Sequence, residues 1–270
     1  EHLLETKPGE DKYEGCRVWE GPRGSVVVYR SDGTPTYALH DLVFARKVAP
    51  HYYVTGEEQK EHFLNLGLHS DKYDVSNIFD TPKHLPLGLV LDPVTGKKMK
   101  SRDGNALSAD DALDMVVEKL DVTPEPEKLA WNVLAWNFLH VSRSQSIKFD
   151  VEEWTKPESP GMYISYTYAR TKAALPDFTP LKSRDELTDD DVDLLGFTSY
   201  FTYWHKLAFD RRDLSTIAHF AHELARKIGN RYHKERIVDG RPAFAYTLHQ
   251  ATFTLRQAME FLSMFPLEKV

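Results

Sequence analysis

The sequence predicts an α/β fold with a parallel sheet in its first part and an all-helical fold in its second part. Short apolar runs alternate with turn signals and helical stretches over residues 25–96, a strand, helix, strand order typical of a parallel sheet covered by helices. The proline-punctuated stretch 122–128, "VTPEPEK", predicts a connector. From residue 129 onward strand signals are few, which favours helices for the remainder of the chain.

Each element of the first part has a local signal. The β-branched run Val26–Val28, followed by Tyr29 and then Ser-Asp-Gly, predicts a buried strand and its turn. Tyr37, Asp41 and Ala45 recur at i, i+4 and i+8, which predicts a helix. The pattern then predicts strand 51–56, helix 57–69 and a strand within 85–96.

The second part is predicted from four helical stretches and one loop. The helical stretches are 128–141, 165–175, 214–236 and 246–265. The acidic, proline-bearing stretch 176–193 predicts a loop among these helices.

Composition excludes several classes of protein. With 41% hydrophobic and 28% charged residues, the 270-residue chain has the composition of a globular protein of one or two domains, and no apolar run approaches the roughly 20 residues of a membrane span. A net charge of -7 argues against a non-specific coat of nucleic acid but permits one local basic face. The single cysteine, Cys16, forms no internal disulfide, and we therefore expect a reducing, cytoplasmic location and no membrane partner.

Three polar stretches follow the three predicted strands of the first part. They are "RSDGTPTYALHD", "TGEEQKEHF" and "GKKMKSRDGN". Open α/β sheets bind ligands at the carboxyl ends of their strands, and we therefore expect these stretches to form a site. Taken singly, such stretches are more often an amphipathic helix face or a solvated turn.

In this order the stretches resemble a class I aminoacyl-tRNA synthetase, and more closely an arginyl-tRNA synthetase. "YVTGEEQKEHF" is similar to that family's Gly-x-x-Gln-x-x-His-Phe motif, and "GLVLDPVTGKKMKSRDGNALSADDALD" resembles its signature loop and the following helix. "PGMYISYTYARTKAAL" resembles its Tyr-x-Gln-Tyr-Ala-His-Ala-Arg helix, with Ser165 and Thr167-Tyr168 as departures. "ELARKIGNRYHKERIV" and the final helix resemble its anticodon-binding domain. The resemblance covers essentially the whole chain.

This resemblance implies an architecture and an activity. It implies a Rossmann-like nucleotide-binding half-domain with the signature loop at 1–120, a helical connector at 121–160 and a helical-bundle anticodon-binding domain at 161–270. The implied activity is that of an arginine-tRNA ligase, with arginine, ATP with Mg²⁺, and tRNA(Arg) as partners. No residue is assigned as a metal ligand.

The resemblance implies an arginine pocket made of Tyr37, Asp41 and Gln59. A guanidinium is planar, permanently charged and only a donor, so one carboxylate with neutral acceptors is a suitable receptor. The alternative for Asp41 is a solvated carboxylate on a surface helix.

The signature loop is implied to act on ATP. Its cations Lys98, Lys100 and Arg102 are implied to neutralise the leaving pyrophosphate, which is electrostatic catalysis without a covalent intermediate. Ser101 replaces the loop's second lysine, and Asp103 stands where many relatives carry another lysine. The implied ATP-binding residues are Gly56, His62, Lys98 and Met99. For His62 the alternative is a core position.

The family's His-x-Gly-His element is absent from these 270 residues. We therefore expect either the carboxyl-terminal part of a synthetase, inactive by itself, or a shortened paralogue. The rival functions are a non-catalytic tRNA-binding or regulatory module and an enzyme that activates arginine for a small-molecule acceptor.

A run of cations in the second part predicts tRNA contacts. The predicted tRNA-binding residues are Arg226, Lys227, Arg231 and Lys234. The alternative is a solvated helix face, or pairing of these cations with Glu223 and Glu235. Four nearby aromatic residues are candidates for base stacking or for helix core, namely Tyr200, Phe201, Tyr203 and Trp204.

Overall fold

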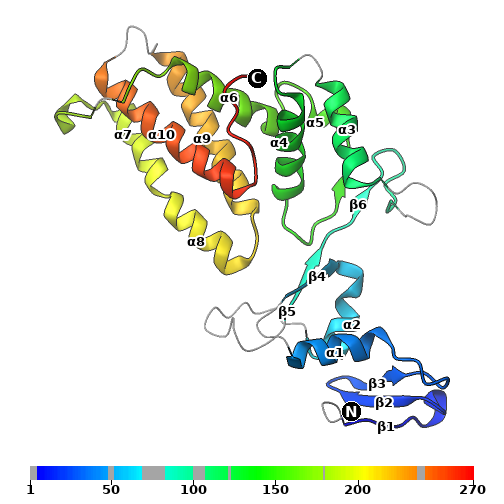
Figure 1. Cartoon of the computed structure of the whole chain (residues 1–270). Helices are drawn as coiled ribbons and strands as arrows, with labels where there is room; N and C mark the ends of the chain where they lie inside the picture. The colour runs from blue at the N-terminus through cyan, green and yellow to red at the C-terminus, as the bar shows by residue number, and fades with distance from the viewer. Residues whose placement is uncertain are drawn as a thin grey trace. The chain divides into compact units, whose positions relative to one another are not determined.

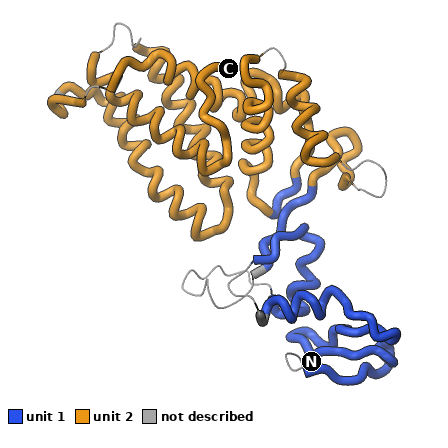
Figure 2. Tube along the Cα trace, in the orientation of Figure 1, with its two compact units in different colours: residues 1–89, 144–146 blue, residues 90–143, 147–270 orange. Residues whose placement is uncertain are grey.

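The structure is a computed structural model that divides into two compact units (Figures 1 and 2). It describes residues 5–47, 52–68, 83–99, 107–120, 123–178, 180–235 and 241–270. Unit 1 comprises residues 1–89 and 144–146, and unit 2 comprises residues 90–143 and 147–270. The expected boundary at residue 120 therefore lies inside unit 2.

Unit 1 begins with an antiparallel sheet of three strands, β1 (Lys7–Pro8), β2 (Arg17–Gly21) and β3 (Gly24–Tyr29). The tight turn between β2 and β3 needs Gly24, whose φ of 119° is strained for any residue with a Cβ. The strand predicted at 26–29 is confirmed as β3. Its expected place in the parallel sheet is wrong, because among the described residues β3 pairs with β2.

The strand, helix, strand prediction is confirmed in the next part of unit 1. α1 (Tyr37–Lys47) leads to β4 (Tyr52–Gly56), and the short η2 (Glu57–Gln59) and α2 (Lys60–Asn65) follow. β5 (Lys83–Leu87) then pairs parallel with β4. The core between these elements contains Val28, Leu42, Phe63 and Leu66.

Unit 2 carries a short parallel pair of strands and a first group of helices. β6 (Val90–Leu91) pairs with β7 (Ile147–Lys148), so the apolar run expected as one strand is divided between β5 and β6. The helices of this group are α3 (Ala109–Lys119), α4 (Pro126–Leu139) and α5 (Val151–Trp154). They pack around Val116, Leu129 and Val133, which are fully buried.

The remaining helices form a bundle around α9 (Figure 1). They are α6 (Pro160–Ala174), α7 (Asp189–Ser199), α8 (Phe201–Arg211), α9 (Ser215–Lys234) and α10 (Pro242–Phe261). Their core contains Phe220, Leu224 and Phe244, with exposed fractions of 1% or less. The expected loop 176–193 ends earlier than predicted, since α7 begins at Asp189, and η5 (Arg184–Glu186) precedes it.

A departure from the family pattern has a structural role in this bundle. The hydroxyl of Ser165 in α6 is buried and accepts a hydrogen bond of 3.0 Å from the side-chain amide of Asn132 in α4. The same amide donates to the carbonyl of Phe265, and the Asn132 side-chain carbonyl accepts from the Phe265 amide. A serine at 165 therefore satisfies a buried amide that ties α4, α6 and the carboxyl-terminal segment together.

Within the described part of the chain, every helix is too short or too polar to serve as a membrane span.

Candidate functional site

Asp41 is the most constrained of the predicted arginine-pocket residues. It lies in the middle of α1, and its Oδ2 is 2.7 Å from Nε2 of His62 in α2. Its backbone carbonyl accepts a hydrogen bond of 2.8 Å from the hydroxyl of Tyr53 in β4. The main chain of Asp41 is therefore fixed by β4, and its side chain is fixed by α2.

The other two residues of the predicted arginine pocket are exposed. Tyr37, one helical turn before Asp41, is 83% exposed. Gln59 ends η2 and precedes His62 by three residues, about one helical turn. The contact between Asp41 and His62 thus brings the start of α2, and Gln59 with it, towards α1. A carboxylate, a phenol and an amide are present on neighbouring elements, and their role as a guanidinium receptor stays a prediction.

A group of aromatic rings packs next to Asp41 and His62 in unit 1. The buried ring of Phe63 packs against the rings of Tyr53 and His84, with centroid distances of 4.8 and 4.4 Å. Burial, and then the charge of Asp41, raise the pKa of Tyr53 to about 12, so its hydroxyl stays a donor to the Asp41 carbonyl at any ordinary pH. The fully buried His84 forms a 2.9 Å hydrogen bond through Nε2 with the hydroxyl of Thr55.

Gly56 and His62 were predicted to bind ATP. Gly56 ends β4, where the extended backbone turns into η2. The side chain of His62 is 30% exposed, and its ring meets the edge of Phe63 at 5.1 Å. Its position is therefore intermediate between the core and the surface, with Asp41 as its polar partner.

The start of the signature loop is a tight turn in unit 2. Oδ1 of Asp92 accepts hydrogen bonds from the amides of Val94 and Thr95, which together with the Thr95 hydroxyl lower the pKa of Asp92. Gly96 has a φ of 65°, and the chain then returns so that Lys98 pairs with Leu91. This turn places the exposed Lys98 at the end of β6.

Met99 faces the apolar side of the same unit. It lines a pocket of about 490 Å³ together with Leu107, Trp131 and Leu134 among other apolar residues. Lys100, Ser101, Arg102 and Asp103 lie outside the described residues. The predicted catalytic roles of Lys100 and Arg102 therefore stay predictions.

The four predicted tRNA-binding cations all lie on α9, and each has an acidic partner. Arg226 contacts Glu223 at 2.8 Å, Lys227 contacts Asp193 at 2.7 Å and Lys234 contacts Asp190 at 3.0 Å. Arg231 contacts both Asp191 and Glu235. The pairing alternative, with Glu223 and Glu235 as partners, is confirmed for Arg226 and Arg231.

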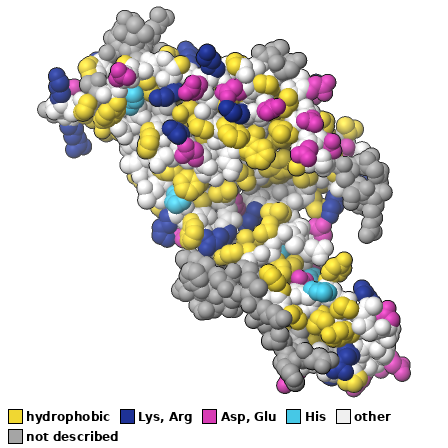
Figure 3. Space-filling view, viewed as in Figure 1, with side chains coloured by type: hydrophobic (Ala, Val, Ile, Leu, Met, Phe, Trp, Pro, Cys, Tyr) yellow, Lys and Arg dark blue, Asp and Glu magenta, His cyan; other side chains and the backbone are white. Residues whose placement is uncertain are grey.

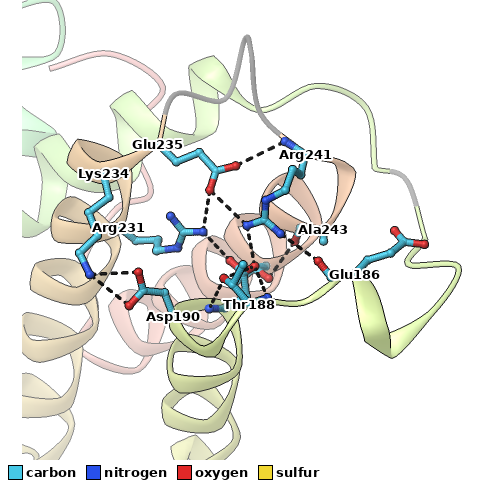
Figure 4. A network of polar contacts seen from close by, with 10 residues as sticks. Glu186, Thr188, Asp190, Arg231, Lys234, Glu235, Arg241 and Ala243 are labelled. Carbon is cyan, nitrogen blue, oxygen red and sulfur yellow. Dashed lines mark hydrogen bonds and ion pairs between the residues drawn. The ribbon is translucent and has the colours of Figure 1, made fainter.

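Arg231 differs from its three neighbours in burial. Its side chain is 7% exposed, whereas those of Arg226 and Lys234 are 55% and 60% exposed. It joins an ion network that also contains Asp191, Glu235 and Arg241 (Figure 4). Arg226, Lys227 and Lys234 therefore reach solvent, and Arg231 connects α9 to α7 and α10.

Asp191 is the centre of this network and was missed from the sequence. It is fully buried, yet Arg231 and Arg241 each donate to it at 2.8 Å, and the amide and hydroxyl of Thr188 donate as well. Burial alone raises the pKa of Asp191, but these hydrogen bonds outweigh burial and hold the pKa at about 2. The signal was present in Thr188-x-x-Asp191, a capping box at the start of α7.

The four aromatic candidates divide into two pairs. Phe201 and Trp204 pack against the core at Phe220, as the helix-core alternative expected. Tyr200 and Tyr203 are 60% and 59% exposed and lie at the junction of α7 and α8. Of the four, this second pair is the more exposed, and the Tyr203 ring also contacts Trp204 at a centroid distance of 6.1 Å.

Two further observations concern metal clusters and surface charge among the described residues. These residues include no cluster of three histidine, cysteine, aspartate or glutamate side chains that holds a metal ion. Figure 3 shows basic and acidic side chains interspersed over the helical unit on the face drawn. The hydrogen bond from Tyr53 to the Asp41 carbonyl was also not predicted from the sequence, although Tyr53 lies in the strand before the Gly-x-x-Gln motif.

Comparison with curated proteins finds arginine-tRNA ligases. That of Leuconostoc citreum is 28% identical over 236 residues, which cover 78% of this chain and 41% of the relative. That of Streptococcus pneumoniae is 30% identical over 272 residues, which cover 90% of this chain and 47% of the relative. The chain thus spans about half the length of these relatives. No protein-family model matches it.

Comparison with solved structures finds arginyl-tRNA synthetases as well. The arginyl-tRNA synthetase of Thermus thermophilus has a TM-score of 0.75 at 17% identity, over 98% of this chain and 56% of that one. The arginyl-tRNA synthetase of Plasmodium falciparum has a TM-score of 0.72 at 17% identity, over 99% of this chain and 50% of that one. At this identity the structures support the fold alone. Together with the sequence matches, they confirm the resemblance predicted from the sequence.

Proposed function

We propose that this homologue of arginine-tRNA ligases contributes the second half of a class I synthetase catalytic domain and a helical anticodon-binding domain. The proposed reaction is ATP-driven formation of arginyl adenylate, followed by transfer of arginine to tRNA. The observation that carries the proposal is the sequence match to arginine-tRNA ligases over 90% of the chain. The proposed domains are 1–120, the connector 121–160, and 161–270.

The proposed arginine pocket is formed by Tyr37, Asp41 and Gln59. The ordered carboxylate of Asp41 supports this assignment, since it lies one helical turn from Tyr37 and contacts the turn of α2 that follows Gln59. A guanidinium binds a fixed carboxylate more tightly than a flexible one, because less side-chain freedom is lost on binding.

The proposed ATP site uses Gly56, His62, Lys98 and Met99, with Lys98, Lys100 and Arg102 on the leaving pyrophosphate and Mg²⁺ bound with the nucleotide. The position of Lys98 after the turn made by Asp92 and Gly96 supports a loop with an exposed cation. The metal is proposed to bind together with ATP, and no protein residue is proposed as its ligand.

The proposed tRNA surface comprises the exposed cations Arg226 and Lys234 and the half-buried Lys227 on α9, and the buried Arg231 anchors this helix to α7. Their acidic partners are also at the surface and exchange readily for phosphate oxygens, since exposed ion pairs are worth only about 0–1 kcal/mol. The exposed rings of Tyr200 and Tyr203 are the proposed stacking partners for unpaired bases.

The test of the catalytic part is arginine-dependent exchange of pyrophosphate into ATP. We expect none from the 270-residue chain, with or without tRNA, because the sequence contains no His-x-Gly-His element. We expect exchange from a protein that joins this chain to the unmatched half of a relative. Exchange by the chain alone would contradict the dependence on that element. Exchange without any tRNA binding would favour the rival enzyme that transfers arginine to a small molecule.

A further inference from the structure

His62 is the only described residue that contacts the carboxylate of Asp41. Oδ2 of Asp41 lies 2.7 Å from Nε2 of the imidazole, and among the residues that the structure describes Oδ1 has no hydrogen-bond or ion-pair partner. The Asp41 and His62 side chains are 26% and 30% exposed. The carboxylate therefore has one occupied oxygen and one oxygen open to a ligand.

The kind of hydrogen bond that His62 makes affects how the Asp41 carboxylate can receive a cation. A carboxylate only accepts hydrogen bonds, so Nε2 of His62 carries the proton and donates it. A single N–H donor of this kind fixes one carboxylate oxygen and leaves the other open, whereas a bidentate arginine would occupy both. The nearby cation Arg23 is paired with Glu61, and no lysine or arginine of the described segments forms an ion pair with Asp41.

The imidazole is itself held in place. Its ring meets the edge of the buried Phe63, whose ring is stacked at 4.4 Å on the fully buried His84. The hydroxyl of Tyr53 fixes the Asp41 carbonyl from β4 at the same time. The distance between the two side chains is thus set by the core of unit 1 rather than by two free rotamers.

From this geometry we propose that His62 is a positioning residue for guanidinium recognition. It holds the carboxylate of Asp41 in one orientation through the hydrogen bond to Oδ2 and leaves Oδ1 open to a ligand. The inference rests on the proposed arginine pocket and adds to it a residue whose implied place was beside the adenosine. In this role His62 determines how strongly the pocket prefers a guanidinium to the neutral, isosteric urea group of citrulline.

The test compares arginine and citrulline binding to three variants of the chain. NMR titrations with each ligand give an affinity ratio for the unsubstituted chain, for His62→Leu and for His62→Gln. We expect His62→Leu to lower the preference for arginine about tenfold, since an unoriented carboxylate loses most of one charge-assisted hydrogen bond. His62→Gln keeps an N–H donor and should retain most of the preference.

A matched control separates positioning from folding. Thr55→Val removes the comparable hydrogen bond of His84 Nε2 in the same unit, and we expect it to lower the melting temperature without changing the affinity ratio. If His62→Leu keeps the full preference for arginine, or weakens the binding of both ligands equally, the inference is wrong. The proposed arginine pocket is not contradicted by that result. If the unsubstituted chain binds arginine no better than citrulline, the proposed pocket is wrong and the inference falls with it.

Discussion

Two buried or half-buried aspartates in this protein have opposite surroundings. Asp191 in unit 2 is fully buried and accepts hydrogen bonds from Thr188, Arg231 and Arg241, so both of its oxygens are occupied. Asp41 in unit 1 is partly exposed and has one donor, His62, on one oxygen. The first carboxylate is paired with two guanidinium groups of the fold, and the second has a single imidazole donor.

This difference separates a structural carboxylate from a receptor. A buried charge that lacks partners costs several kcal/mol, so a saturated network such as that of Asp191 holds helices together and has no capacity for a ligand. A carboxylate at the surface that is oriented but not neutralised costs little to keep and gains energy only when a cation binds. The number and charge of its partners, rather than the carboxylate itself, indicate the role.

The largest expected effect comes from breaking the ion network around Asp191. Asp191→Asn leaves Arg231 buried with only Glu235 opposite it, and we expect a loss of about 3–5 kcal/mol in the free energy of unfolding. Urea unfolding followed by circular dichroism measures this loss, because most helices lie in unit 2. The neighbouring Asp190→Asn is the control. It breaks only the exposed pair with Lys234 and should cost less than about 1 kcal/mol. Equal losses for both variants would contradict the distinction by burial.

An intermediate effect is expected in acid. The pKa of Asp191 is lowered from 3.8 to about 2 in the folded state, so its contribution to stability is complete above about pH 4 and is lost as the pH falls to about 2. The contribution is about 2 kcal/mol, and the lowered pKa of Glu235 acts in the same direction. Urea unfolding at several pH values between 2 and 5 measures it. In Asp191→Asn the slope in this range should be shallower, and an unchanged slope would assign it to other carboxylates.

The smallest effect on stability is expected at the exposed cations of α9. Replacing Arg226 and Lys234 together by alanine should change the free energy of unfolding by less than about 1 kcal/mol per pair. The same change should weaken tRNA binding and reduce the dependence of affinity on salt, because each phosphate contact releases counterions. Binding at several salt concentrations, beside a thermal melt, measures both. Arg231→Ala, by contrast, should act mainly on the melt. Unchanged tRNA binding in the double variant would remove this face of α9 from the proposed interface.

Local patterns predicted much of this fold. Helical periodicity located α1, α4, α6, α9 and α10, and the β-branched run located β3. These predictions succeeded because each depends on residues within one element, where spacing decides which side chains share a face. The family motifs likewise located Asp41 and His62, although no motif indicated that the two side chains meet.

Two of the errors came from pairings between distant residues, and the third came from a local signal that was missed. β3 was expected in a parallel sheet, but its neighbour is decided by the hairpin that turns at Gly24. Arg231 was predicted with the other cations of α9, and only the packing of α7 and α10 against that helix buries it. The start of α7 at Asp189 was missed in an acidic stretch, because its signal is a single capping box.

The sequence by itself determined the family to which this chain is similar, most of its helices, and the residue types suited to a guanidinium, a pyrophosphate and an RNA backbone. Only the tertiary structure decided which charges are available to a ligand. Asp41 and Asp191 both lie in helices of the structure, and they differ because the first meets one imidazole and the second meets two guanidinium groups across the bundle. The free energy of a charge depends on its desolvation and on its partners, and both are set by residues 21 to 50 positions away along the chain.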